Sequence, residues 1–133
     1  MNRSLKLLLL INGIFNAVGA VILILFPSGM MDIFGIRLTT LQYFICYLLG
    51  ACSFSLAVLS LYAQKVTDGY SLHIIALTFF LFHLTTAGVG IYSYLQGLSP
   101  CVWVNIGIHS AFAVFFWWLG LSGKINNHTN AIK

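Results

Sequence analysis

Five polar side chains lie inside long apolar runs of the sequence, and they have the greatest capacity for chemistry. They are Asn12 and Asn16 in the first run, His83 in the third, and Asn105 and His109 in the fourth. An imidazole can donate or accept hydrogen bonds, hold a metal ion or carry a proton, and an amide can both donate and accept. Such groups are costly in lipid, which makes them candidate functional residues wherever a run crosses a membrane.

The spacing of these residues predicts that they gather at one level. Asn12 and Asn16 are four residues apart, as are Asn105 and His109, so each pair shares one face of a helix. Counting about 1.5 Å per residue from the ends of the runs puts His83 and His109 about one helical turn apart in depth. We therefore expect a central polar cluster of His83, His109, Asn16 and Asn105, with Asn12 on the same face as Asn16.

Four interpretations of this cluster stay open at the level of sequence. It could tie helices together by hydrogen bonds, or bind a small polar or amphipathic molecule such as a quinone head group beside nearby phenylalanines. His83 and His109 could also be the axial ligands of a haem, although no CxxCH attachment motif is present. A histidine pair relaying protons is the fourth, and it lacks a carboxylate partner in the apolar runs. We expect no catalytic residue, no dedicated metal site and no cofactor, with haem as the alternative.

The composition identifies the solvent of this chain. Of its 133 residues, 60% are hydrophobic and only 6% are charged. A water-soluble domain normally has about a quarter charged residues, so water cannot solvate most of this surface. The formal net charge of +4 comes without a basic stripe interleaved with exposed aromatic residues, which gives nucleic-acid binding no support. The composition is that of an integral membrane protein.

Four apolar stretches predict four membrane-spanning helices, over about residues 5–26, 41–63, 72–95 and 101–121. Each has about the 20 residues that a helix needs to cross a bilayer. The links between the later runs are short, so the fold class is an all-α membrane protein, with one domain over residues 1–133 folded as an antiparallel up-down bundle. The longer link after the first span predicts a short interfacial helix over residues 30–37.

Charge and aromatic residues predict the orientation of the spans. Arg37 alone falls at one side of the membrane, whereas five basic residues fall at the other: Arg3, Lys6, Lys65, Lys124 and Lys133. The positive-inside rule then puts both termini, including a tail over residues 122–133, in the cytoplasm. Tyrosine and tryptophan residues cluster at both expected membrane boundaries, as interfacial aromatic residues do.

Sequence motifs of common enzymes are missing. The chain has no HExxH, no GxSxG, no Walker glycine loop and no pair of carboxylates deep in a span. We therefore expect a non-enzymatic accessory or small-ligand-binding membrane protein. The alternatives are a haem- or quinone-binding electron-transfer protein and a subunit of a small oligomeric transporter. The expected partners are the lipid bilayer, further copies of the chain or another membrane protein, and no nucleic acid.

The stretch from Leu7 to Gly35 resembles the small four-helix bacterial membrane proteins grouped around DoxX and its uncharacterised relatives. The shared features are Gly13 and Gly19 in the first span, then Pro27, then a short apolar segment ending in Gly35. Further likeness is found in 49–51 (Leu-Gly-Ala) and 108–109 (Ile-His). The resemblance implies a four-helix integral protein of the bacterial inner membrane. It carries over no catalytic residue, because that group is functionally mixed.

Overall fold

The computed structural model describes residues 3–122, and all of its regular structure within that range is helical. Four helices are long and apolar enough to cross a membrane, as the sequence predicts. The elements in chain order are α1 (Arg3–Leu25), α2 (Pro27–Ile33), α3 (Thr40–Ala63), α4 (Gly69–Leu95) and α5 (Val102–Phe116), with α5 continued by the π-helical turn η1 (Trp117–Leu121). Of the predicted cytoplasmic tail, residues 123–133 lie outside the described range.

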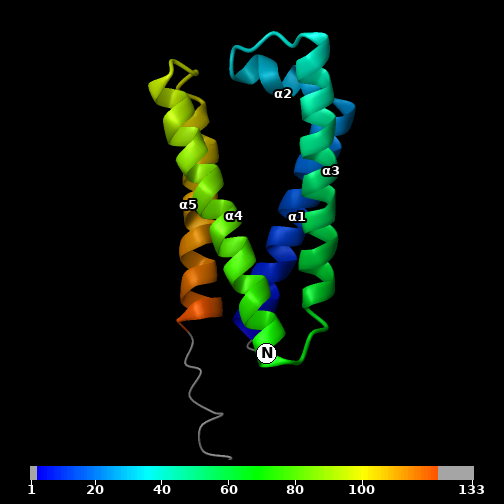
Figure 1. Cartoon of the computed structure of the whole chain (residues 1–133), viewed down its shortest axis with the longest axis vertical. Helices are drawn as coiled ribbons and strands as arrows, with labels where there is room; N and C mark the ends of the chain where they lie inside the picture. The colour runs from blue at the N-terminus through cyan, green and yellow to red at the C-terminus, as the bar shows by residue number, and fades with distance from the viewer. Residues whose placement is uncertain (1–2, 123–133) are drawn as a thin grey trace, which may run out of the picture.

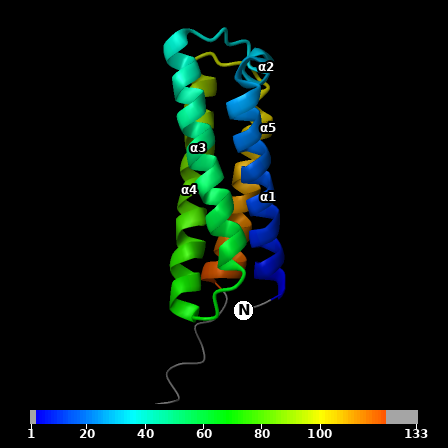
Figure 2. The same ribbon diagram turned by 90° about the vertical axis from the view of Figure 1, so that its right-hand side faces the viewer.

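The helices pack mainly as two hairpins. The first hairpin joins α1 to α3, and the second joins α4 to α5 and η1 (Figure 1). The two hairpins meet at the end of the molecule where α1 begins and separate toward the end that carries α2, as Figure 1 shows. In Figure 2 the first hairpin lies in front of the second. The apolar core lies at the end where they meet: Leu5, Leu8, Leu9, Ala63, Ala76, Phe79 and Phe116.

Glycine allows the close approach of helices at several positions in this arrangement, and Gly13 and Gly120 are two of them. A Cβ atom on Gly13 of α1 would lie 2.8 Å from Cδ2 of Leu61 on α3. A Cβ atom on Gly120 of η1 would lie 2.4 Å from Cβ of Ala76 on α4. Both distances are far below van der Waals contact, so these glycines set how closely the helix axes can approach, as small residues do in membrane proteins.

Capping groups explain where α3 and α4 begin. At α3, the side-chain oxygen of Gln42 accepts the backbone N–H of Thr39 at 2.8 Å. At α4, the carboxylate of Asp68 accepts the backbone N–H of Ser71 at 2.7 Å. This cap lets α4 begin at Gly69, three residues before the predicted start, because a side-chain acceptor satisfies an otherwise unpaired N–H of the first turn.

The short helix in the first long link also differs from its predicted range. It occupies Pro27–Ile33 rather than residues 30–37. Pro27 stands at the first helical positions, where its fixed φ favours helix and its missing N–H costs nothing. Gly35 has a φ of +73°, a left-handed conformation that favours glycine and ends the helical path. The helix lies across the end of the molecule where the hairpins separate (Figure 1).

The outer surface of the four long helices is apolar. Leucine, isoleucine, valine and phenylalanine side chains are more than a third exposed along every one of them, for example Leu7, Phe54, Leu81 and Val114. In water such a surface would be an aggregation hazard, whereas in a bilayer it is the expected lipid contact. Within the described part of the spans, a few polar side chains are fully buried. They are exceptions to this apolar character, and they locate a candidate site.

Candidate functional site

A buried hydrogen-bond network links the two hairpins across the middle of the long helices. On the first hairpin, the amide nitrogen of Asn12 donates to Oγ of Ser60 at 3.0 Å, which joins α1 to α3. Oγ of Ser60 in turn donates to the backbone carbonyl of Leu9 at 2.8 Å. The amide nitrogen of Asn16 lies 2.9 Å from the backbone oxygen of Asn12 and 3.1 Å from its Oδ1. Asn12 is therefore the centre of this half of the network.

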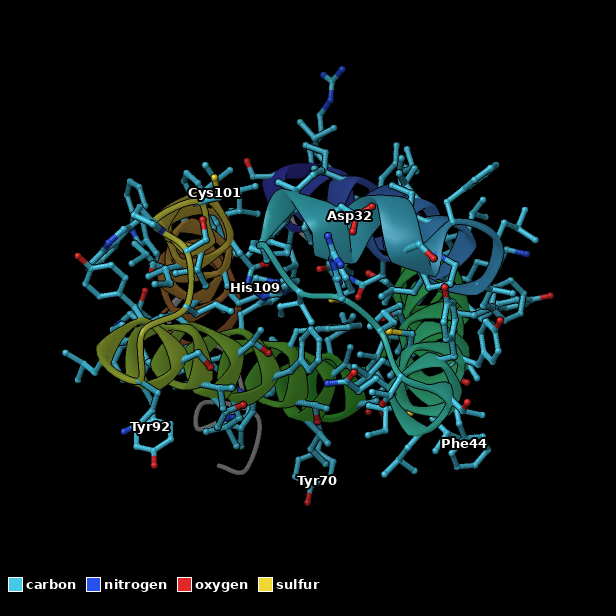
Figure 3. All side chains as sticks on the ribbon, turned by 90° about the horizontal axis from the view of Figure 1, so that it is seen from above. Asp32, Phe44, Tyr70, Tyr92, Cys101 and His109 are labelled. Carbon is cyan, nitrogen blue, oxygen red and sulfur yellow. The ribbon has the colours of Figure 1, made fainter. Side chains whose placement is uncertain are left out.

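The second hairpin contributes two histidines that face each other. Nδ1 of His83 on α4 lies 2.8 Å from Nδ1 of His109 on α5. Nε2 of His83 lies 2.8 Å from Oδ1 of Asn12, and this contact connects the hairpins. Asn12 and His83 are fully buried, with 0% exposure, and His109 is 7% exposed. Seen along the helices, His109 lies in the interior of the molecule, while Tyr70 and Tyr92 point outward (Figure 3).

The acceptors of the network fix the direction of its hydrogen bonds. A backbone carbonyl only accepts, so the hydroxyl of Ser60 must donate to Leu9 and must accept from the amide of Asn12. Oδ1 of Asn12 then faces His83 and accepts from Nε2, which must carry a hydrogen. In a neutral ring the other nitrogen is an acceptor, so Nδ1 of His83 accepts from Nδ1 of His109.

All the bonds of this chain therefore point the same way, from His109 through His83, Asn12 and Ser60 to Leu9. Bonds aligned in this manner polarise and strengthen one another in a low-dielectric interior. For two neutral rings, His109 carries its hydrogen on Nδ1 and presents Nε2 as a free acceptor. No hydrogen bond among the described residues involves Nε2 of His109. No fully buried side-chain nitrogen or oxygen of those residues lacks a partner, so this unpaired nitrogen is accessible rather than fully buried.

Aromatic rings surround the histidine pair. The ring of His83 stacks on that of Phe112, with 4.8 Å between centroids and 13° between planes. The ring of His109 makes edge contacts with Phe15 of α1 at 5.8 Å and with Phe82 of α4 at 5.9 Å. Apolar walls with few polar groups are typical of sites for small molecules. The accessible nitrogen of His109 therefore stands in an aromatic environment.

Four of the five polar residues singled out in the sequence belong to this network, and the fifth does not. Asn105 is half-buried, and no hydrogen bond is found for it among the described residues. It lies one helical turn before His109 on α5. Ser60 of α3 belongs to the network instead, and the sequence analysis did not single it out. A serine near a helix end is usually bonded to its own helix.

The geometry of the two histidines bears on axial haem ligation. Imidazole nitrogens bind a metal ion at about 2 Å, so two ligands on opposite sides of one ion are about 4 Å apart. The facing nitrogens of His83 and His109 are 2.8 Å apart and share a hydrogen bond. Ligation through these nitrogens would need the rings to move apart. Within residues 3–122 there is no group of three or more His, Cys, Asp or Glu side chains placed to hold a metal ion.

Comparison with known proteins leaves the site to be interpreted from its own geometry. No protein-family model, no curated protein and no solved structure matches the chain.

Proposed function

We propose that this chain is a small integral membrane protein that binds a small amphipathic molecule at the His/Asn cluster, in a non-enzymatic or accessory role. The observation that carries the proposal is the free acceptor on Nε2 of His109, at the open end of a chain of otherwise paired buried groups. A network that served only to join helices would be expected to pair both ends. Here one end stops at a backbone carbonyl and the other at an accessible nitrogen beside two aromatic rings.

The proposal includes the threading of the chain through the membrane. We infer an antiparallel up-down bundle with both termini in the cytoplasm, in a bacterial inner membrane, as the positive-inside pattern and the resemblance to proteins around DoxX suggest. Exposed aromatic residues at both ends of the helices support two interfacial belts, with Tyr92 and Trp103 at one end and Tyr62 and Trp118 at the other. The cluster then lies near mid-depth, where a hydrogen-bonding side chain has few alternatives to a protein or ligand partner.

Native mass spectrometry of the full chain tests the binding role. The protein would be purified in mild detergent from the membranes of its own host, and bound molecules would be identified by mass. We expect the unchanged protein to retain one small amphipathic molecule, and His109→Leu to lose it because the acceptor is gone. The matched control is His73→Leu. It removes an imidazole near the start of α4, and no hydrogen bond is described for that side chain. The control should retain the molecule.

Folding must be followed in parallel, because His109 also bonds His83. The helical circular dichroism and the unfolding midpoint of His109→Leu would be measured beside those of the control. If the unchanged protein carries only detergent and bulk phospholipid, equally in all three forms, the cluster is a structural tie and the proposed role is wrong.

A further inference from the structure

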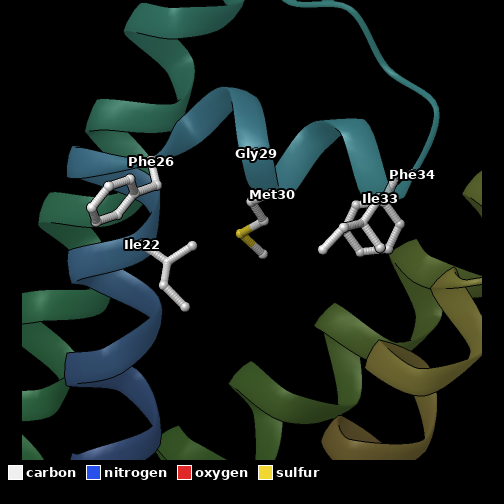
Figure 4. A pocket seen from close by; sticks show the side chains of 6 residues that line it. All are labelled: Ile22, Phe26, Gly29, Met30, Ile33 and Phe34. Carbon is white, nitrogen blue, oxygen red and sulfur yellow. The ribbon is translucent and has the colours of Figure 1, made fainter.

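A second feature lies between the histidine pair and the end of the molecule that carries α2. An apolar pocket of about 470 Å³ is formed where α1 meets α2. Its walls are Ile22, Phe26, Gly29, Met30, Ile33 and Phe34. Figure 4 shows the side chains of Met30 and Ile33 pointing from α2 into the space beside α1. This volume is within the range of sites for small molecules, and its walls offer no polar side chain to a ligand.

One face of α1 connects this pocket to the histidine pair. Phe15, Gly19 and Ile22 follow one another at spacings of four and three residues, so they lie along one stripe of the helix. Phe26 comes directly after the helix, and its backbone N–H donates to the carbonyl of Ile22. Phe15 contacts the ring of His109, and Ile22 and Phe26 line the pocket. Between them, a Cβ atom on Gly19 would meet nothing within 4 Å. The stripe is therefore open at Gly19, which lies between Phe15 and Ile22, two positions about 10 Å apart along the helix.

The polar end of this path selects the chemistry of its occupant. With neutral rings, Nε2 of His109 can only accept, so a head group that donates a hydrogen bond fits it. A head group that carries only carbonyl oxygens, such as that of an oxidised quinone, would place two acceptors against each other. The apolar end suits an alkyl or prenyl chain, which buries its methylene groups against the pocket walls.

We propose that the site takes an amphipathic molecule with a hydroxyl head and an alkyl tail, a long-chain phenol or alcohol, its hydroxyl on Nε2 of His109 and its tail along Gly19 into the pocket under α2. This inference rests on the proposed binding role and narrows it to one class of ligand. The tail must have about eight or more carbons to extend from the level of Phe15 to the pocket.

Two probes that differ only in the donor test the head group. These are 4-nonylphenol and its methyl ether, 4-nonylanisole, which keeps the ring and tail and lacks the hydroxyl hydrogen. Each would be titrated into the full chain in lipid nanodiscs, with binding followed by the ¹⁵N chemical shift of His109 and corrected for partition into lipid. We expect the phenol to bind about five- to tenfold more tightly than the ether, the effect of one hydrogen bond in a buried site.

Two glycine substitutions test the path. Gly19→Leu places a side chain in the open stripe, and we expect it to weaken phenol binding by at least about tenfold. Gly88→Leu is the matched control, since Gly88 is an exposed position of α4 where a Cβ atom also meets nothing within 4 Å. Both variants replace an unconfined helix glycine by a better helix former, so both should fold.

The outcomes separate this inference from the proposed function. Equal affinity for phenol and ether overturns the donor head, and unchanged binding in Gly19→Leu overturns the path along α1. In either case, or if neither probe binds, the native mass spectrum decides whether the binding role survives. A bound molecule that is lost in His109→Leu supports the binding role with a different class of ligand. If no such molecule is found, the binding role itself is wrong.

Discussion

Replacing Asn12 by alanine should destabilise the protein more than any other single amide removal. The Asn12 side chain makes hydrogen bonds to Ser60, His83 and Asn16, at 3.0, 2.8 and 3.1 Å. Two of these bonds, to Ser60 and His83, join different helices. Side-chain hydrogen bonds between membrane helices contribute about 0.6 kcal/mol each on average, so the loss of these two should lower the free energy of unfolding by about 1 kcal/mol. The variant also leaves the Nε2 hydrogen of His83 without its acceptor in a buried position, which adds to the loss.

The assay is reversible unfolding in mixed micelles, followed by circular dichroism as the fraction of denaturing detergent rises. Asn105→Ala is the matched control, because it removes the same side chain from a half-buried position for which no hydrogen bond is described. We expect its free energy of unfolding to change by less than about 0.5 kcal/mol. Equal losses in the two variants, or a loss below about 0.5 kcal/mol for Asn12→Ala, would refute the assignment of Asn12 as the centre of the network.

Three further predictions concern helix packing at Gly120, the hydroxyl group of Ser60 and the topology of the chain in the membrane. Gly120→Ala forces a methyl group against Ala76 and should lower the free energy of unfolding by about 1–3 kcal/mol, whereas Gly107→Ala, in open space, should leave it unchanged or raise it slightly. Ser60→Ala should cost about 1 kcal/mol in the same assay, and Ser55→Ala, an exposed hydroxyl bonded to its own helix, should cost almost nothing. A reporter enzyme that works only in the cytoplasm should be active when it is fused to the C-terminus, and a reporter that works only outside should be active when it is placed in the loop after α2. The reverse pattern would overturn the proposed topology.

The helices could be predicted from sequence because lipid imposes a simple rule on the chain. About 20 consecutive apolar residues are needed to cross the bilayer, and the runs here are bounded by groups such as Pro27 and Gln64. The ends were less predictable, because they depend on local capping. Asp68 extends α4 to Gly69, and Pro27 and Gly35 shift α2 toward the end of α1.

The types of residue in the candidate site could be predicted from the sequence, but which of them join the hydrogen-bond network could be predicted less well. Polar groups such as His83 and Asn12 must avoid lipid, so their burial follows from the composition of their spans. Which polar groups bond one another depends on how the helices pack. Ser60 bonds Asn12 within the first hairpin, whereas no hydrogen bond is described for Asn105. The pocket under α2 depends on the placement of Met30 and the other side chains of a short helix, for which periodicity gives no rule.

The positions of the hydrogens on the two imidazoles determine whether the network runs from His109 to Leu9 and ends in a free acceptor. Solid-state ¹⁵N NMR of the histidine-labelled chain in lipid, at a pH where both rings are neutral, distinguishes protonated from unprotonated ring nitrogens. We expect a hydrogen on Nε2 of His83 and on Nδ1 of His109, which leaves Nε2 of His109 as the free acceptor. A spectrum with the hydrogen of neutral His109 on Nε2 would contradict the direction of the chain and the ligand chemistry inferred from it.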